Sequence, residues 1–143
     1  SVLKKYDIPP VYLELEITEN IVITDINTAM DTIVTLQNMG IKVSIDDFGT
    51  GYSSLAYLRE LPIDKIKIDR SFIGEFTQND SDLTIVKSMI KLSHGLGKRV
   101  LAEGVETSEQ LQLLRNLGCD AAQGYFISKP ISEEVFTKYF SHK

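Results

Sequence analysis

The 143-residue chain has little of several residue types, and each scarcity excludes a class of protein. It contains one cysteine, Cys119, two histidines and no tryptophan. A single cysteine cannot form an internal disulfide, and so few cysteines and histidines do not make a zinc site. No apolar run approaches the roughly 18 residues of a membrane span. We therefore expect a cytoplasmic domain, whose parent protein could still be anchored in a membrane through other domains.

Positive charge is also in short supply. Fifteen lysines and arginines stand against 20 aspartates and glutamates, which gives a net charge of -5 and a pI near 5.0. This balance argues against a broad phosphate-binding surface, so we do not expect duplex nucleic acid as a partner. A small anionic ligand would need metal ions or a local basic residue. The composition, 43% hydrophobic and 24% charged, indicates a single globular domain.

Short apolar runs alternate with amphipathic segments along the chain. The runs are typical of strands, and they cover residues 11–17, 42–46, 65–69, 99–103 and 121–126. Helical patterns with capping signals lie between them, such as the capping box of Thr107 and Gln110. This alternation predicts a parallel sheet with right-handed crossovers, as either an open doubly wound sheet or a (β/α) barrel.

The residue types within the strands separate these two architectures. Glu14 and Glu16 share one face of the first run, while Lys65 and Lys67 share one face of the third. A sheet covered by helices on both faces favours continuous apolar strands, whereas the inner face of a barrel accommodates charges near its mouth. We therefore predict an α/β fold of the TIM (β/α) barrel type. A complete barrel needs roughly 200 residues or more, so we expect residues 1–143 to be the C-terminal part of one, lacking the N-terminal strands.

Acidic side chains gather at or just past the C-terminal ends of the predicted strands. They are Glu16 and Glu19 in EITE, Asp46 and Asp47 in DDFG, Asp69 in KID, and Glu103 and Glu106 in AEGVE. Desolvating so many carboxylates at one mouth costs on the order of several kcal/mol per ion unless cations compensate them. All-oxygen ligands favour Mg²⁺ or Mn²⁺ over zinc, and two adjacent aspartates suit a two-metal site that hydrolyses a phosphodiester. A lysine there would neutralise phosphate charge or orient the attacking water.

The same segments carry a resemblance to a known family. The ordered motifs LELEITEN, IDDFGTGYSSLAYLRELPIDKIKIDRSFI, LAEGVET and QGYFISKP resemble the EAL-domain phosphodiesterases of the bacterial second messenger cyclic di-GMP, over essentially all 143 residues. The resemblance implies a TIM-type barrel that linearises cyclic di-GMP to pGpG with two Mg²⁺ or Mn²⁺ ions. It also implies a dimer and, in many members, an upstream sensory or GGDEF domain.

The resemblance further implies roles for the central residues. Glu16 and Asp46 would bind the first metal ion. Asp46, Asp47 and Glu103 would bind the second. Lys67 would hold the attacking water against the substrate, and Glu103 is the candidate base. Asp46 would therefore contact both ions.

Other residues would support this centre, again by resemblance. Gln123 would help to line the substrate site, and Glu19 would anchor the loop of residues 48–54. Asp69 and Glu106 would contact the metal ligands without binding the metal ions themselves. Structural interpretations remain open for several of them: Lys67 could be a counter-ion to Glu16 or Asp69, Glu106 could stabilise a helix start, and Gln123 could satisfy backbone groups. The segment YSSLAYLREL could pack in the core or form a partner surface.

Two ligands expected from the family have no counterpart in this sequence. The glutamate of the name-giving EAL motif and a metal-binding asparagine belong to early strands, and neither motif is present. We therefore expect the chain alone to be nearly inactive, with exposed strand edges that favour a homodimer or swapped oligomer.

Two other functions stay open. One is a catalytically degenerate domain that binds cyclic di-GMP or a protein without cleaving it. The other is an unrelated barrel enzyme that uses carboxylate-bound Mg²⁺ in enolate chemistry. Intact DDFG, KID and AEGVE motifs favour the hydrolase, because a receptor would not need both adjacent aspartates.

Overall fold

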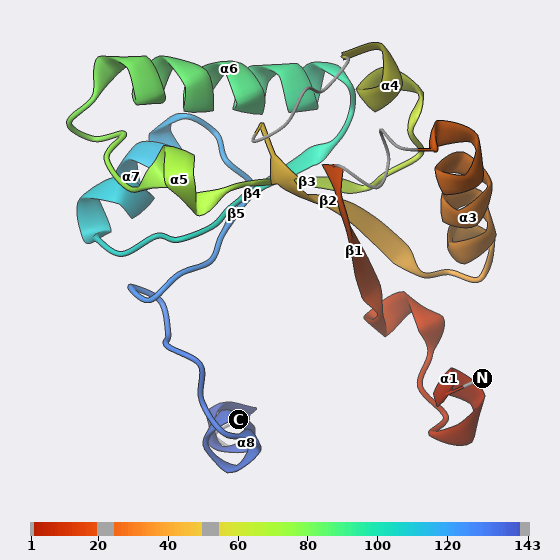
Figure 1. Cartoon of the computed structure of the whole chain (residues 1–143). Coiled ribbons are helices and arrows are strands. Elements are labelled where there is room, and N and C mark those ends of the chain that lie inside the picture. Colours follow the sequence, from red (N-terminus) through yellow and green to blue (C-terminus); the bar gives the residue numbers. More distant parts are fainter. Residues whose placement is uncertain (1, 20–24, 50–54, 141–143) are drawn as a thin grey trace.

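The computed structural model describes residues 2–19, 25–49 and 55–140 (Figure 1). Its strands are β1 (Glu14–Thr18), β2 (Lys42–Phe48), β3 (Lys65–Ile68), β4 (Arg99–Ala102) and β5 (Ala121–Ala122). They form one parallel sheet in the order of the chain, β1-β2-β3-β4-β5. A doubly wound sheet reverses its strand order at a switch point, whereas a (β/α) barrel adds each strand beside the previous one. The strand order therefore confirms the predicted barrel-type fold.

Helices connect the strands on one side of the sheet. The longer ones are α3 (Ile26–Asn38), α4 (Leu55–Glu60), α6 (Asp80–Gly95) and α7 (Ser108–Asn116). Shorter or terminal ones are α1 (Val2–Lys5), the 3₁₀ helix η1 (Pro10–Tyr12), α5 (Arg70–Ile73) and α8 (Glu133–Phe140). In Figure 1, α1 and α8 extend away from the side of the sheet that α3 to α7 surround. Within the described ranges, none of these helices has the length and apolar character needed to cross a membrane.

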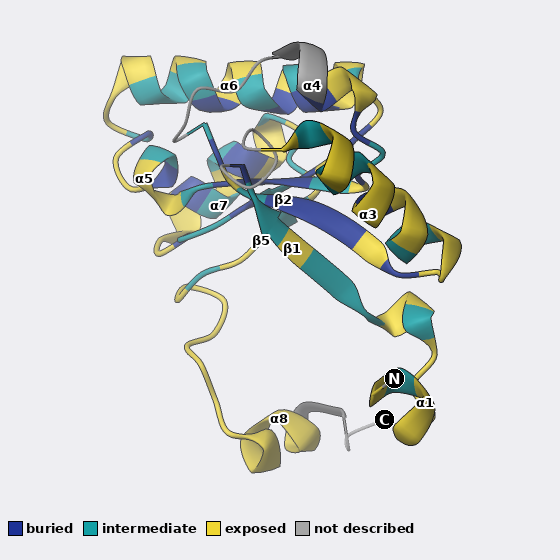
Figure 2. Cartoon of the chain, turned by 45° about the vertical axis from the view of Figure 1, so that its right-hand side comes forward, coloured by how far each residue is buried: buried dark blue, intermediate teal, exposed yellow. Residues whose placement is uncertain are grey.

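The hydrophobic core lies between the sheet and the connecting helices, where Figure 2 shows most of the buried residues. Val43 and Ile45 of β2 and Ile66 of β3 pack with Ile33 of α3 in one cluster. Full burial of an aliphatic side chain of this size contributes about 1.5–3 kcal/mol. Alternate strand residues therefore hold the helices on one face, which leaves their neighbours in the sequence on the other face.

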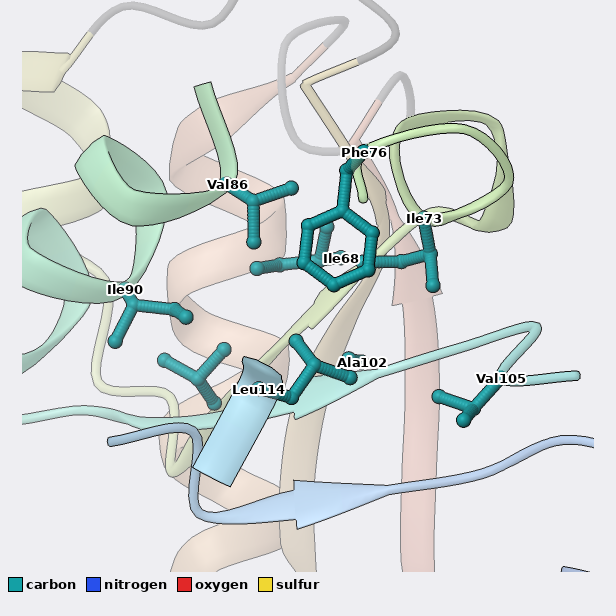
Figure 3. Packing of buried hydrophobic residues seen from close by; sticks show 9 residues of the cluster. Ile68, Ile73, Phe76, Val86, Ile90, Ala102, Val105 and Leu114 are labelled. Carbon is teal, nitrogen blue, oxygen red and sulfur yellow. The ribbon is translucent and has the colours of Figure 1, made fainter. Parts of the chain in front are cut away.

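A second cluster continues the core towards the end of the sheet (Figure 3). Ile68 of β3 and Ala102 of β4 meet Val86 and Ile90 of α6 and Leu114 of α7. All five are almost completely buried, with at most 1% of their surface exposed. This packing fixes the ends of β3 and β4, from which Lys67 and Glu103 emerge.

The face of the sheet opposite the helices is ionic, as the alternation predicted. Lys65 on β3 donates two hydrogen bonds of 2.7 Å to the carboxylate of Glu14 on β1. Partial burial would raise the pKa of Glu14, but the hydrogen bonds and positive charge of Lys65 outweigh it and leave this pKa below its usual value. The pair spans β2 and ties the first strand to the third.

The structure corrects some predicted boundaries. The first strand begins at Glu14 rather than residue 11, because η1 occupies Pro10–Tyr12. The last strand ends at Ala122 rather than residue 126, since the chain then turns to bond with the segment after β4. The sequence pattern predicts a helix that starts after Ser81, but α6 begins at Asp80, because the Asn79 side chain accepts hydrogen bonds from the following backbone N–H groups.

Other local predictions hold. Thr107 and Gln110 form the predicted capping box at the start of α7. In the segment YSSLAYLREL, Leu58 is 3% exposed, and Leu61, the last residue of the segment, is 2% exposed. Both belong to the first core cluster, so core packing accounts for these two leucines. Residues 52–54 lie outside the described part of the chain, and the partner surface predicted for this segment stays a prediction.

Candidate functional site

The adjacent aspartates lie at an irregularity in β2. The strand pairs regularly with β3 as far as Ile45, and the register then shifts before Phe48. Asp47 has a φ of 56°, in the left-handed region that non-glycine residues seldom adopt. Its N–H donates to Asp46 Oδ1 at 3.1 Å. A regular strand sends successive side chains to opposite faces, and such a bulge relaxes that rule beside many active sites.

Lys67 is the centre of the site, because it joins carboxylates from three other segments. Its Nζ lies 2.7 Å from Glu16 Oε1 on β1 and 3.2 Å from Asp46 Oδ1 on β2. It also lies 2.7 Å from Glu103 Oε1, just past β4. Lys67 is only 4% exposed. The structure thus brings together four of the residues that the sequence predicted from separate strand ends.

The charge state of Lys67 follows from these contacts. Burial would lower the pKa of its ammonium group, but hydrogen bonds with Glu103, Glu16 and Asp46 outweigh burial and raise this pKa above its usual value. Lys67 therefore stays protonated at neutral pH and acts as a cation and hydrogen-bond donor, not as a base. Three carboxylates around one ammonium leave an excess of negative charge, which favours a further cation.

The donor set fits a hard divalent metal ion. Within residues 2–19, 25–49 and 55–140, no three acidic, histidine or cysteine side chains are already arranged to hold a metal. Instead, the carboxylates of Glu16, Asp46 and Glu103 converge on the Lys67 ammonium. These three side chains offer only carboxylate oxygens, the ligand type that Mg²⁺ and Mn²⁺ prefer. Asp47, the next residue of β2, is exposed, and the contact it makes with the Asp46 carboxylate is through its backbone N–H.

Glu19 contacts the start of the glycine-rich loop. The side chain is 5% exposed, and its Oε2 accepts a hydrogen bond of 3.0 Å from the Gly49 N–H. Gly49 has a φ of 94°, and a Cβ there would collide with Met89 and Phe72. Residues 50–54 lie outside the described part of the chain, so the predicted anchoring of loop 48–54 is described only at this first contact.

Asp69 has a local role in the structure. It caps the short helix α5 by accepting a hydrogen bond of 2.9 Å from the Ser71 N–H. Partial burial would raise the pKa of Asp69, but the hydrogen bonds from Ser71 and Arg70 lower it below its usual value. The described ion pairs of Lys67 do not include Asp69, so of the two proposed counter-ions the structure shows Glu16.

A hollow of about 230 Å³ lies beside Glu103, and the two remaining predicted residues, Glu106 and Gln123, are among the residues that line it. It is lined by Arg70, Glu103, Gly104, Glu106, Gln123, Gly124 and Tyr125. Glu106 and Gln123 therefore lie next to the ionic centre without entering its ion pairs. The sequence did not predict Arg70, which directly follows the strand-end motif KID and whose place beside the hollow only the structure shows.

A family model and several curated proteins are similar to this chain. A family model described as EAL domain matches residues 1–130. The cyclic di-GMP phosphodiesterase NbdA of Pseudomonas aeruginosa is 46% identical over 120 residues, which are 84% of this chain and 15% of NbdA. The bifunctional diguanylate cyclase/cyclic di-GMP phosphodiesterase MucR of the same organism is 40% identical over 94% of this chain and 20% of MucR. The chain spans between 15 and 20% of the length of the curated relatives it matches.

Solved structures share the fold. The EAL domain of Mycobacterium smegmatis DcpA superposes with a TM-score of 0.91 at 44% identity, over 98% of this chain and 63% of that one. The PaMucR phosphodiesterase in complex with c-di-GMP gives a TM-score of 0.90 at 40% identity, over 94% of this chain and 54% of that one. Klebsiella pneumoniae BlrP1, solved with cyclic di-GMP and either calcium or manganese, gives 0.79 at 35% identity, over 87% of this chain and 32% of that one.

Proposed function

Because this chain belongs to the EAL-domain family, we propose that it is the C-terminal part of a phosphodiesterase domain that hydrolyses cyclic di-GMP to linear pGpG. The observation that carries the proposal is the convergence of Glu16, Asp46 and Glu103 on Lys67. The four residues come from four separate segments, and none of them belongs to the two hydrophobic core clusters. Relatives named as cyclic di-GMP phosphodiesterases, and solved relatives in complex with the dinucleotide, support the choice of substrate.

Glu16, Asp46, Asp47 and Glu103 would hold two Mg²⁺ or Mn²⁺ ions, which supply activation of water and neutralisation of phosphate charge when bound. A solved relative with manganese or calcium supports the choice of a divalent ion. Asp46 would be a ligand of both ions, and its carboxylate is the one that contacts Lys67 from β2.

The chain's own residues would perform the other parts of the reaction. The Lys67 ammonium stays charged and can donate hydrogen bonds to the attacking water and to the phosphate. Glu103 can accept the proton of that water, because its carboxylate lies 2.7 Å from the lysine that would hold the water. Gln123 lines the adjoining hollow and can orient the substrate through its amide.

The proposal includes the activity of the isolated chain. The chain covers 54% of the PaMucR structure and 63% of the DcpA structure, and the EAL glutamate and the metal-binding asparagine have no counterpart in it. We therefore expect the 143 residues alone to turn over cyclic di-GMP far more slowly than a complete domain.

The test uses a complemented domain, in which this chain is joined to the portion of the DcpA EAL domain that it does not match. With Mn²⁺, we expect the complemented domain to convert cyclic di-GMP to pGpG, measured by chromatography, and the chain alone to be nearly inactive. Asp46→Asn should lower kcat by at least about 100-fold, because one carboxylate is lost to both metal ions.

Asp31→Asn is the matched control, since Asp31 is an exposed aspartate on α3 that takes no part in the ion pairs of Lys67. It should retain full activity. Substantial cleavage by Asp46→Asn would refute the metal-ligand role. A folded complemented domain that binds cyclic di-GMP without cleaving it would instead support the binding-module alternative.

A further inference from the structure

The hollow beside Glu103 contains one residue for which the proposed reaction has no role. Among its lining residues, Arg70 is the one cationic side chain, next to the carboxylates of Glu103 and Glu106. Lys67, the other cation of the site, is already engaged with three carboxylates. In the described part of the chain, the ion pairs do not include the exposed Arg70 guanidinium, although its charge acts on the neighbouring Asp69 carboxylate. An exposed arginine thus lines a hollow whose other charged lining residues are both glutamates.

The backbone places Arg70 firmly at this position. A Cβ on Gly104 would lie 2.5 Å from the Cβ of Arg70, so the two segments approach as closely as a glycine allows. Gly104 also has a φ of 73°, which strains any other residue. Gly104 directly follows Glu103. The Cα and Cβ of Arg70 therefore pack against the segment directly after β4, beside the candidate base Glu103.

Resting on the proposed function, we propose that Arg70 binds the phosphodiester of cyclic di-GMP that is not cleaved. The substrate carries two phosphodiesters, and the ionic centre around Lys67 accounts for one of them. A guanidinium is planar and presents paired N–H donors that match phosphate oxygens. The hollow lies directly beside the ionic centre and shares Glu103 with it, so a ligand with two linked phosphates can reach both.

The assignment predicts an effect on substrate affinity. The contact forms with a phosphate that does not change during the reaction, so it stabilises the bound substrate and the transition state equally. Loss of such an interaction raises KM and leaves kcat nearly unchanged. Arg70→Gln in the complemented domain should therefore raise KM for cyclic di-GMP about 10- to 100-fold, the scale of one charge-assisted hydrogen-bonded contact. Arg70→Lys should recover part of the affinity, because it keeps the charge without the paired donors.

A second substrate distinguishes the two phosphates. Bis(p-nitrophenyl) phosphate has a single phosphodiester, the one that is cleaved, so Arg70→Gln should leave its KM unchanged. Lys87→Gln, which removes one exposed positive charge from α6, is the control and should change neither KM. Thermal unfolding should be the same for Arg70→Gln and the unaltered domain, since Arg70 is exposed.

Several results would overturn the assignment. One is a KM for cyclic di-GMP within about twofold of the unaltered domain. Another is an equal rise in KM for both substrates, or a fall in kcat at constant KM, because each would place Arg70 at the reacting phosphate. If the unaltered complemented domain cleaves neither substrate, the proposed function fails and this assignment fails with it. If it cleaves both and Arg70→Gln behaves like it, only this assignment fails.

Discussion

At the scale of single residues, Lys67 shows how one side chain can organise a site before any metal is bound. A buried lysine is costly unless its charge is paired, and here three carboxylates pair with it. The arrangement keeps Glu16, Asp46 and Glu103 close together despite their mutual repulsion. The same ammonium occupies the space between the oxygens, so a divalent ion has to compete with it.

This competition can be measured. Lys67→Met in the complemented domain should bind Mn²⁺ about tenfold more tightly or better in the absence of substrate, because a positive charge within 3.2 Å of three ligand oxygens is removed. Turnover should nevertheless be lost. Lys65→Met is the matched control, since Lys65 lies on the same strand and pairs with Glu14, which is not a predicted metal ligand. Calorimetric titration with Mn²⁺ gives the affinities, and weaker binding by Lys67→Met than by Lys65→Met would contradict the competition.

Sequence patterns predicted the ionic centre well and its surroundings less well. Glu16, Asp46, Lys67 and Glu103 could be predicted because parallel strands end at a common edge and each motif marks such an end. Arg70 could not be identified in this way, because the pattern of a sequence does not show which exposed side chain borders a hollow. The capping role of Asp69 was also hidden, since a four-residue helix has too few residues to show a period.

At the scale of elements, the close approach of the segment after β5 to the backbone of Val105 requires a glycine at position 124. Residues 121–126 are predicted as a strand from the sequence, yet the strand ends at Ala122. Val105 N–H donates to the carbonyl of Gln123 at 3.1 Å, and Phe126 N–H donates to the carbonyl of Val105 at 3.0 Å. Gly124 lies between these two bonds, and a Cβ there would collide with the backbone of Val105. A contact of this kind between distant segments is not visible in a local sequence pattern.

Replacing this glycine should disturb both stability and the substrate hollow. Gly124→Ala forces the two backbones apart, and we expect it to lower the free energy of unfolding of the complemented domain by about 1–3 kcal/mol. Gly95→Ala, at the end of α6, is the control, because a Cβ there meets nothing within 4 Å. It should be neutral or slightly stabilising. Urea unfolding followed by circular dichroism measures both, and equal stability of the two variants would show that the close approach at Gly124 is not needed.

At the scale of the whole molecule, the sheet is wound like a barrel and is open at both edges. In the described part of the chain, β1 pairs with β2 and β5 pairs with β4, with no strand on their other sides. Large apolar side chains after β5 and on α8 are exposed, among them Tyr125, Ile127 and Phe136. They line a hollow of about 650 Å³ between the segment after β5 and α8.

The winding could be predicted from the sequence because the charged face of the strands is incompatible with helices on both sides of a sheet. What covers the open edges is not encoded in the local patterns of 143 residues. Association of copies through these edges therefore stays a prediction.

The central claim is that acidic side chains from separate strands together bind a pair of divalent ions. The most direct measurement is an anomalous-scattering map from crystals of the complemented domain grown with Mn²⁺. We predict two manganese peaks, both in contact with Asp46, with Glu16 at one and Glu103 at the other. A map in which manganese lies elsewhere, with Asp46 and Glu103 still bound to Lys67 alone, would contradict the account.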